Sequence, residues 1–220
     1  MVEIYAADIS TLADPKEHPE YLKGLSENRI EKILKHKTQK GRVQSLGAGL
    51  LLKSVLEKYG VSEYYIWTDE KGKPHAPGIC FNLSHTEGLA ICVIGRKDVG
   101  CDVEYQKKAP ASVAKHFFTE SENSYLKEQE NYDREFFRIW TMRESYMKMT
   151  GDGLRVAFHK YEMRLEDGKF WVYCEGKKED CYLREYDVPG YQVTICTKET
   201  ESADTIQFVN VGEKYNEQYK

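Results

Sequence analysis

The chain has 220 residues, of which 40% are hydrophobic and 31% are charged, and its formal net charge at pH 7 is −4. This length allows one domain or two small ones, and it is sufficient to bury a sizeable core. The mild negative charge argues against a general nucleic-acid binder, which needs a large basic surface. No segment approaches the roughly 18 apolar residues of a membrane span. We therefore expect neither nucleic acid nor a membrane as a partner.

Two features of the sequence, its first residues and the spacing of its cysteines, indicate the cellular compartment of the protein. The apolar run over residues 2–9 contains Glu3 and Asp8 and has no basic leader, so we expect a strand there and not a signal peptide. The six cysteines are scattered without a Cys-x-x-Cys pair, which argues against a zinc site or a disulfide framework. Several lie in apolar segments, where a reduced cysteine packs as a small hydrophobic residue. These features predict a cytoplasmic protein.

The spacing of apolar residues predicts strands and helices along the first half of the chain. The expected elements are, in chain order, a strand over residues 1–9, helices over 26–36 and 44–59, and strands over 64–68, 81–84 and 89–94. A Gly-Lys-Pro turn at 72–74 and a polar loop at 84–88 separate the later strands.

The second half begins with a similar pattern and then turns to strands. The expected elements are a strand over 99–104, helices over 112–118, 120–128 and 133–149, and strands over 161–165, 169–174, 181–186, 191–197 and 205–209. Residues after 212 are polar and are expected to fray.

A weak internal repeat predicts two similar α/β halves. The tripeptide 26–28 (Ser-Glu-Asn) recurs at 121–123, and the same offset of 95 residues relates Lys53 to Lys148. We expect a half over 1–98, which binds the substrate, and a half over 99–220, which carries the catalytic helix. A cleft between two halves is a favoured place for a ligand site. Because one chain supplies both walls, we expect a monomer.

Three carboxylates give the strongest chemical signal in the chain. Asp102 and Glu104 alternate on the strand over 99–104 and therefore share one face. Glu144 and Lys148 are four residues apart on the helix over 133–149, so they also share a face. Three acidic oxygen donors suit a hard cation such as Mg²⁺, or Mn²⁺, which completes its coordination with water and substrate phosphate. The pattern therefore indicates chemistry on a phosphate or diphosphate.

Each fragment alone has an ordinary explanation. An Asp-x-Glu pair often lies on the solvent face of a half-buried sheet, and a Glu/Lys pair at i, i+4 is usually a surface ion pair worth about 0.2–0.5 kcal/mol. Ser84 and His85 are adjacent in sequence, but neighbouring side chains diverge, so they do not form a nucleophile and base. Hydrogen bonds to phosphate oxygens are the alternative role for these two side chains.

Taken together, these segments resemble the Sfp-type 4′-phosphopantetheinyl transferases. That family has a Gly-φ-Asp-φ-Glu strand, where φ is an apolar residue, and a downstream Trp-Ser/Thr-x-Lys/Arg-Glu-Ala/Ser-x-x-Lys helix. The matching segments are Gly100–Glu104, Trp140–Lys148, the Lys73-Pro74 turn, Phe81–His85 and Phe117–Glu122. The five segments are collinear, and the resemblance covers roughly residues 1–200. Cys101 stands where the family usually has a branched aliphatic residue, so its side chain should face the core.

The resemblance implies a reaction, a fold and a set of ligands. The reaction is transfer of the 4′-phosphopantetheine arm of coenzyme A to a serine of an apo acyl or peptidyl carrier protein, with release of adenosine 3′,5′-bisphosphate. The fold is a pseudo-twofold α/β fold with the active site in the cleft between its halves. By position, Asp102, Glu104 and Glu144 would hold the metal. Coenzyme A phosphates would contact six residues, namely Arg29, Lys32, Arg42, Lys73, Ser84 and His85.

The chemistry of that reaction assigns further roles. Serine attack on a phosphorus atom needs a proton acceptor, and Glu144, directly or through a water, is the expected general base. Lys148 would offset negative charge on the phosphate. Carrier proteins are typically acidic, so we expect docking on a basic and apolar patch formed by Lys107, Lys108 and Lys115.

Two other functions use the same residues. One is a different Mg²⁺-dependent phosphate transferase or hydrolase acting on coenzyme A. The other is a non-catalytic module that binds coenzyme A or a carrier protein. The pathway that the carrier protein serves cannot be read from the sequence.

Overall fold

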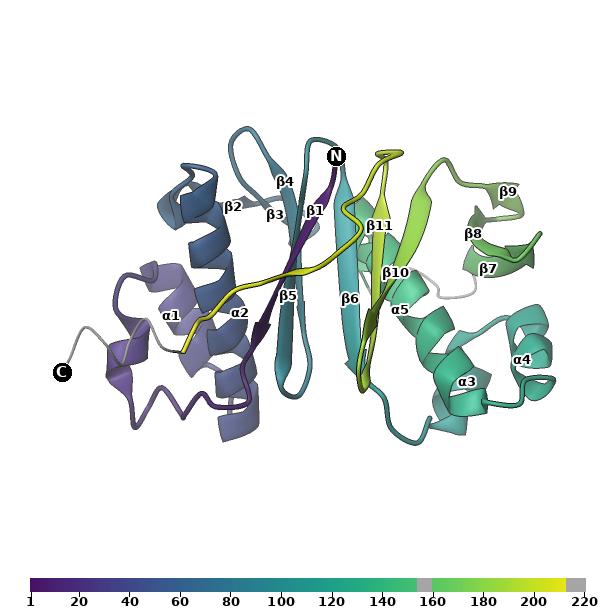
Figure 1. The fold of residues 1–220 in the computed structure, drawn as a ribbon, viewed down its shortest axis with the longest axis horizontal. Helices are drawn as coiled ribbons and strands as arrows, with labels where there is room; N and C mark the ends of the chain where they lie inside the picture. Colours follow the sequence, from purple (N-terminus) through teal and green to yellow (C-terminus); the bar gives the residue numbers. More distant parts are fainter. Residues whose placement is uncertain (154–159, 213–220) are drawn as a thin grey trace.

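The first half of the chain forms an antiparallel sheet with helices on one face. In the computed structural model, which describes residues 1–153 and 160–212, β1 (Glu3–Asp8), β5 (Leu89–Gly95) and β4 (Cys80–His85) lie side by side in that order. Helix α2 (Gln39–Lys58) packs on β5, and α1 (Glu27–Leu34) packs on α2 (Figure 1). The predicted fraying after residue 212 lies outside the described residues.

The second half repeats this order of elements. Strands β6 (Val99–Tyr105), β11 (Tyr191–Thr197) and β10 (Tyr182–Val188) form an antiparallel sheet in that order. The long helix α5 (Tyr132–Thr150) packs on β6 and β11. In each half the chain runs from a strand through helices into a hairpin, and the first strand pairs with the last one. The α/β fold predicted from the sequence is confirmed, while the boundary at residues 98/99 stays a prediction.

The sequence repeat at an offset of 95 residues does not align the helices of the two halves. Ser26 caps α1 and Thr119 caps α4 (Glu120–Lys127), which is an offset of 119 − 26 = 93 residues. The caps of α2 and α5 are Thr38 and Asn131, with the same offset of 131 − 38 = 93. The recurring Ser-Glu-Asn tripeptide is therefore two residues out of register with the structural repeat.

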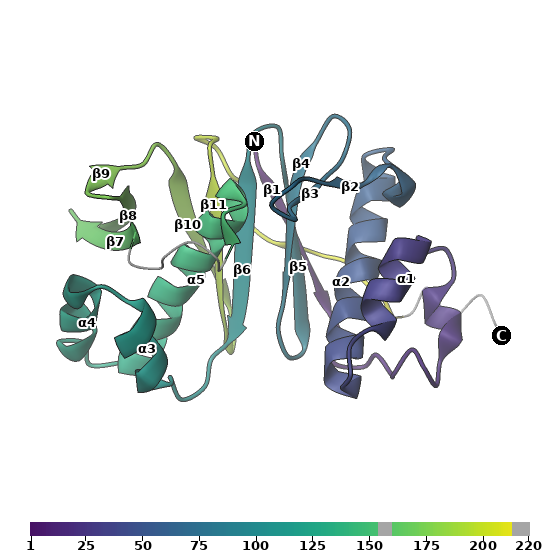
Figure 2. The same cartoon turned by 180° about the vertical axis from the view of Figure 1, so that it is seen from behind.

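One apolar core joins the two halves, and each half has a further core of its own. One face of each sheet contributes to a shared core, formed by β1 and β5 on one side and by β6, β10 and β11 on the other. The opposite faces pack on α2 in the first half and on α5 in the second. The result is a helix–sheet–sheet–helix arrangement, seen from both sides in Figures 1 and 2. In the part of the chain that the structure describes, no helix has the length and apolar character needed to span a bilayer.

A ladder of side chains joins the edges of β4 and β6. Three alternate side chains accept hydrogen bonds from three alternate backbone N–H groups of β6. The pairs are Asn82 Oδ1 with Cys101 N (3.1 Å), Ser84 Oγ with Val103 N (3.3 Å) and Thr86 Oγ1 with Tyr105 N (3.4 Å). These side chains satisfy N–H groups on the edge of β6 that would otherwise lack a partner. We refer to these three pairs as the ladder.

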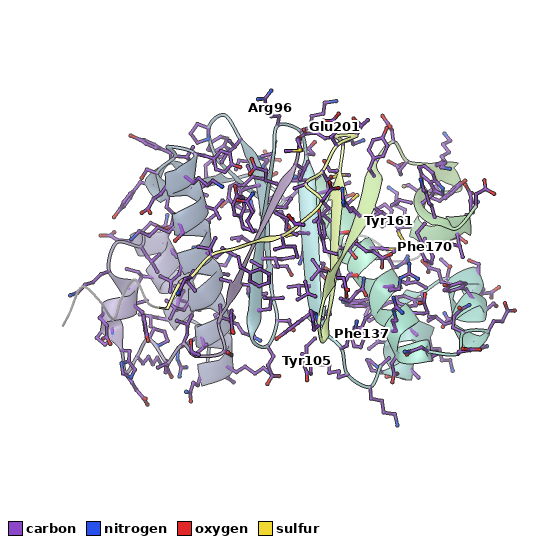
Figure 3. The ribbon with its side chains drawn as sticks, viewed as in Figure 1. Arg96, Tyr105, Phe137, Tyr161, Phe170 and Glu201 are labelled. Carbon is purple, nitrogen blue, oxygen red and sulfur yellow. The ribbon has the colours of Figure 1, made fainter. Side chains whose placement is uncertain are left out.

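The end of the described chain crosses back to the first half. The crossing begins near Glu201, at the end of the sheets where Arg96 also lies (Figure 3), and it continues to β12 (Gln207–Phe208). Strand β12 pairs in parallel with β1, and Val209 N donates to Ala6 O at 2.8 Å. This segment therefore ties the second half to the first.

Several elements differ from the sequence predictions. Helix α2 begins at Gln39 and not near 44, because the Thr38 side chain accepts a hydrogen bond from Gly41 N. The predicted strand over 64–68 is a short 3₁₀ helix followed by a short hairpin. The remaining elements are the 3₁₀ helices Pro19–Leu22 and Glu63–Tyr65, β2 (Trp67–Thr68), β3 (Pro74–His75), α3 (Ala111–Phe117), β7 (Tyr161–Glu166), β8 (Lys169–Cys174) and β9 (Lys177–Lys178).

Gly100 allows β6 to lie directly on the backbone of α5. A Cβ atom built on Gly100 would lie 3.0 Å from Met149 Cα, and it would overlap both Ser145 O and Met149 N. These are helix backbone atoms, which cannot turn away as a side chain can. The missing side chain is therefore a requirement of this contact, and it brings the rest of β6 onto the helix.

We predict that Gly100→Ala destabilises the protein by about 3 kcal/mol, at the upper end of the usual cost of overpacking. The matched control is Gly212→Ala, because a Cβ there would meet, among the described residues, only Thr11 Oγ1 at the ordinary distance of 3.6 Å. Urea unfolding of both variants measures the difference. Equal stability of the two variants would contradict the proposed contact.

Candidate active site

The alternation of β6 separates core residues from site residues, as the sequence predicts. Cys101 and Val103 are buried in the core shared by the two sheets. Asp102 and Glu104 lie on the other face, with Gly100, toward α5. Helix α5 presents Glu144 and Lys148, so one strand and one helix carry the four residues.

Lys148, Asp102 and Ser84 form a closed triangle of polar contacts. Lys148 Nζ lies 2.6 Å from Asp102 Oδ1 and 2.9 Å from Ser84 Oγ. Ser84 Oγ also donates to Asp102 Oδ1 at 2.8 Å. Burial lowers the pKa of Lys148, but the charge and hydrogen bond of Asp102 together with Cys101 and Glu144 raise it by more, so the net shift is upward. Lys148 is therefore a cation held at the carboxylate site.

The two glutamates bind protons unusually tightly. Burial, followed by the negative charge of Asp102, raises the pKa of Glu144 to about 7. The same two causes, in the same order, raise the pKa of Glu104 to about 6, although a hydrogen bond from Trp140 opposes the shift. The carboxylates thus repel one another, and Lys148 offsets only part of that repulsion.

Two buried carboxylate oxygens have no hydrogen-bond partner among the described residues. These atoms are Asp102 Oδ2 and Glu144 Oε1. Within residues 1–153 and 160–212, no three acidic, histidine or cysteine side chains converge tightly enough to hold an ion without rearrangement. Yet unsatisfied oxygens on mutually repelling carboxylates suit a hard divalent cation, which would supply the missing positive charge. The residue types and their electrostatics therefore fit the predicted metal.

A cavity of about 520 Å³ leads from this site into the first half of the chain. Lys148 of α5 and the two basic residues of α1, Arg29 and Lys32, all lie in its lining. The other walls come from the segment after α2 and from β4. They include Glu63, Tyr64, Ile66, Thr68, Gly72, Pro74, Asn82 and Leu83. The cavity therefore connects two groups of positive charge.

The two basic residues of α1 differ in their surroundings. Arg29 Nε donates to Glu63 Oε1 at 3.0 Å, so this guanidinium is oriented by an ion pair. Burial, with the nearby charge of Arg29, lowers the pKa of Lys32. A phosphate bound here would gain from both cations and would remove their mutual repulsion.

Two of the predicted coenzyme A contacts lie elsewhere. Arg42 is buried, and its guanidinium donates to the Asp14 carboxylate and to the backbone oxygen of His36. Lys73 Nζ donates to Met149 O at the end of α5 and lies 3.5 Å from Asp98. Neither side chain is part of the cavity lining. In this structure, Lys73 and Arg42 each connect separate elements of the fold.

Ser84 and His85 lie on the side of β4 near Lys148 and Asp102, but neither one is part of the cavity lining. The Ser84 hydroxyl belongs to the ladder and to the contacts with Asp102 and Lys148. Desolvation of the imidazole and the positive charges of Lys148, His36 and Lys32 lower the pKa of His85 to about 4. His85 is therefore neutral at pH 7, and its ring can donate one hydrogen bond.

A buried ion pair fixes the helix that carries the site, and the sequence patterns did not reveal it. Glu122 accepts hydrogen bonds from Thr119 N (2.8 Å), Met163 N (2.8 Å) and Arg143 Nη1 (3.2 Å). Arg143 also donates to Phe117 O at 3.1 Å. The spacing of Phe117 to Glu122, which resembles that of the family, is thus explained by a capping box and an anchor for α5.

Asn82 is a second residue near the site that the sequence patterns do not single out, although its position in the chain carries a signal. It alternates with Ser84 and Thr86, which predicts a common orientation on one strand. In the structure, the three alternate side chains share one orientation and form the ladder.

Comparisons with known proteins agree with this geometry. Residues 98–196 match the family described as the 4′-phosphopantetheinyl transferase superfamily. The chain is 27% identical over 222 residues to 4′-phosphopantetheinyl transferase Sfp of Bacillus subtilis (strain 168), covering 96% of this chain and 99% of the relative. A second 4′-phosphopantetheinyl transferase of Bacillus subtilis is 31% identical over 156 residues, which cover 68% of this chain and 66% of the relative.

Among solved structures, the chain is similar to the holo-[acyl-carrier-protein] synthase of Thermotoga maritima. The sequence identity is 19% and the TM-score is 0.41, with 49% of this chain and 66% of that chain covered.

The raised pKa of Glu144 predicts a pH-dependent stability in the absence of metal. The folded state binds this proton more tightly than the unfolded state, whose pKa is near the ordinary 4.5. The resulting stabilisation is complete below pH 4.5 and is lost as the pH rises through about 7. We therefore compare the Tm of the unchanged protein with the Tm of Glu144→Gln in EDTA. The advantage of the unchanged protein over the variant should shrink by several degrees between pH 5 and pH 8.

The control for this experiment is Glu130→Gln, because Glu130 is exposed and lies outside the site. Its Tm difference from the unchanged protein should stay constant over the same pH range. Parallel curves for Glu144→Gln and Glu130→Gln would contradict the assignment of a raised pKa to Glu144.

Proposed function

We propose the following reaction for this chain, which belongs to the 4′-phosphopantetheinyl transferase superfamily. It transfers the 4′-phosphopantetheine arm of coenzyme A to a serine of an apo acyl or peptidyl carrier protein. The serine oxygen forms a bond to the phosphorus that carries the pantetheine arm, and the bond from that phosphorus to the bridging oxygen breaks. Adenosine 3′,5′-bisphosphate leaves. The observation that carries this proposal is the cavity lined by Arg29, Lys32 and Lys148, the last of which pairs with Asp102 of the carboxylate site.

The charges along the cavity support one orientation of coenzyme A. The two cations of α1 suit the phosphate on the adenosine ribose, and Lys148 suits the diphosphate. The adenosine end would then lie in the first half and the reacting phosphorus beside β6 and α5. Coenzyme A carries phosphate charge at both of these points, so a cavity lined by three basic side chains suits it.

Asp102, Glu104 and Glu144 would hold Mg²⁺, or Mn²⁺ in its place. When bound, such a cation neutralises charge on the diphosphate and on the departing oxygen. Its charge would also replace the repulsion among the three carboxylates that raises the pKa values of Glu104 and Glu144.

Glu144 is the proposed general base. A carboxylate with a pKa of about 7 can accept the serine proton, and about half of it is ionised at pH 7. Its Oε1 atom has no hydrogen-bond partner among the described residues, so it is available for that proton. Lys148 would move from Asp102 toward a phosphate oxygen as negative charge develops there, with Ser84 orienting its ammonium group.

The compartment and the assembly state are part of the proposal. All six cysteines are free thiols, which favours the reducing cytoplasm. Both walls of the cavity come from one chain, so a monomer is sufficient for the reaction.

We expect a purified apo carrier protein to gain one phosphopantetheine mass when incubated with this chain, coenzyme A and Mg²⁺. Glu144→Gln should lower the rate at least 100-fold, because it removes both the base and a metal ligand. EDTA should stop the reaction, and Glu130→Gln should leave it unchanged. Intact-protein mass spectrometry measures all four.

Two other outcomes of the same experiment favour the alternative functions. Consumption of coenzyme A without any carrier protein would identify a hydrolase. Binding of coenzyme A with no mass gain across acyl and peptidyl carriers would identify a non-catalytic module.

We further expect the carrier protein to dock beside α3. Lys107 and Lys108 are exposed directly after β6, and Lys115 is exposed on α3. The charge of Lys107 reaches Glu104, where it lowers the pKa, so this patch borders the site. Charge reversal of all three lysines should raise the KM for an acidic carrier at least tenfold and leave kcat nearly unchanged.

The matched control is Lys177→Glu, an exposed lysine on β9. Steady-state kinetics with the carrier protein as the varied substrate separates the two parameters. A KM that stays the same after triple charge reversal would exclude docking at this patch.

A further inference from the structure

The ladder fixes the orientation of the Asn82 amide. Asn82 is buried, with 6% of its surface exposed. Its side-chain oxygen accepts hydrogen bonds from the backbone N–H of Cys101 at 3.1 Å and from the Cys101 thiol at 3.7 Å. A backbone N–H can only donate, so the amide atom that faces it must be the carbonyl oxygen Oδ1. The NH₂ group, Nδ2, must therefore point the other way.

The Nδ2 group of Asn82 is a donor that the fold does not use. None of the described residues accepts a hydrogen bond from it. Asn82 lines the cavity together with Leu83 and Lys148. A buried side chain whose acceptor is satisfied and whose donor faces a cavity is typical of a group that contacts a ligand.

The other two side chains of the ladder differ from Asn82 in this respect. Ser84 uses its hydroxyl for Val103, Asp102 and Lys148, and Thr86 lies beyond the end of β4. Neither one lines the cavity. Two residues along a strand are about 6.6 Å apart. The Asn82 side chain therefore starts about 6.6 Å along β4 from Ser84, whose hydroxyl meets the Lys148 ammonium.

We propose that Asn82 binds coenzyme A directly, donating a hydrogen bond from Nδ2 to an oxygen of the diphosphate, while Oδ1 keeps β4 in register with β6. This inference rests on the proposed function, because it takes coenzyme A as the occupant of the cavity. The amide is neutral, so it adds a directed donor beside Lys148 without adding charge. Because the same side chain holds the two halves in register, the position of the donor is fixed relative to Asp102.

Three variants separate contact with the ligand from support of the fold. Asn82→Asp keeps an acceptor for Cys101 N–H but replaces the donor by a carboxylate oxygen. Asn82→Leu removes both groups without adding charge. Thr86→Val removes one pair of the ladder outside the cavity and serves as the control for loss of ladder contacts.

The measurement is the Kd of each variant for coenzyme A by isothermal titration calorimetry in the absence of a carrier protein, with Tm recorded for each. A hydrogen bond to a charged phosphate is usually worth a factor of about 10 to 100 in affinity. We expect both Asn82 variants to weaken coenzyme A binding at least tenfold. Thr86→Val should lower Tm and leave the Kd unchanged.

Two results would overturn the inference. One is a Kd for Asn82→Asp equal to that of the unchanged protein. The other is equal weakening by all three variants, which would show that Asn82 acts only through the ladder. Asn82→Asp decides the matter even if Asn82→Leu fails to fold, because it preserves the hydrogen bond to Cys101. Failure of the proposed function would give a different result. The unchanged protein would bind coenzyme A, this binding would depend on Asn82, and no carrier protein would be modified.

Discussion

The direct contact between β6 and α5 at Gly100 determines the geometry of the whole site. Asp102 and Glu104 follow Gly100 on the same face of the strand, and Glu144 and Lys148 lie on the helix that the glycine touches. Because no side chain separates the two backbones, the acidic residues of the strand lie within hydrogen-bond distance of the helix. The apolar cores on the two faces of the sheet, together with the buried Arg143–Glu122 pair, hold α5 in this position.

This contact concentrates negative charge, and the proposed mechanism depends on that charge. Burial and mutual repulsion raise the pKa values of Glu104 and Glu144, while Lys148 compensates only Asp102 directly. The repulsion within such a site is unfavourable, and the divalent cation that we propose would relieve it. The ladder between β4 and β6 holds the two halves in register, and one of its side chains, Asn82, also lines the cavity.

The sequence was sufficient for the parts of the site that depend on local periodicity. Alternation on a strand placed Asp102 opposite to Cys101, and helical spacing placed Glu144 beside Lys148. It was insufficient where a partner comes from a distant segment. Arg42 pairs with Asp14, and Lys73 caps α5 through Met149 O, so neither basic side chain lines the cavity that its type and its family resemblance suggested. The pairing of β4 with β6 through side chains likewise depends on how the two halves meet.

The most direct test of this account is a crystal structure of the chain with coenzyme A and Mg²⁺. We expect the diphosphate beside Lys148, the adenosine phosphate beside Arg29 and Lys32, and the metal bound by Asp102, Glu104 and Glu144. Coenzyme A bound elsewhere on the molecule would contradict the account. So would a metal that binds the diphosphate without contacting any of the three carboxylates.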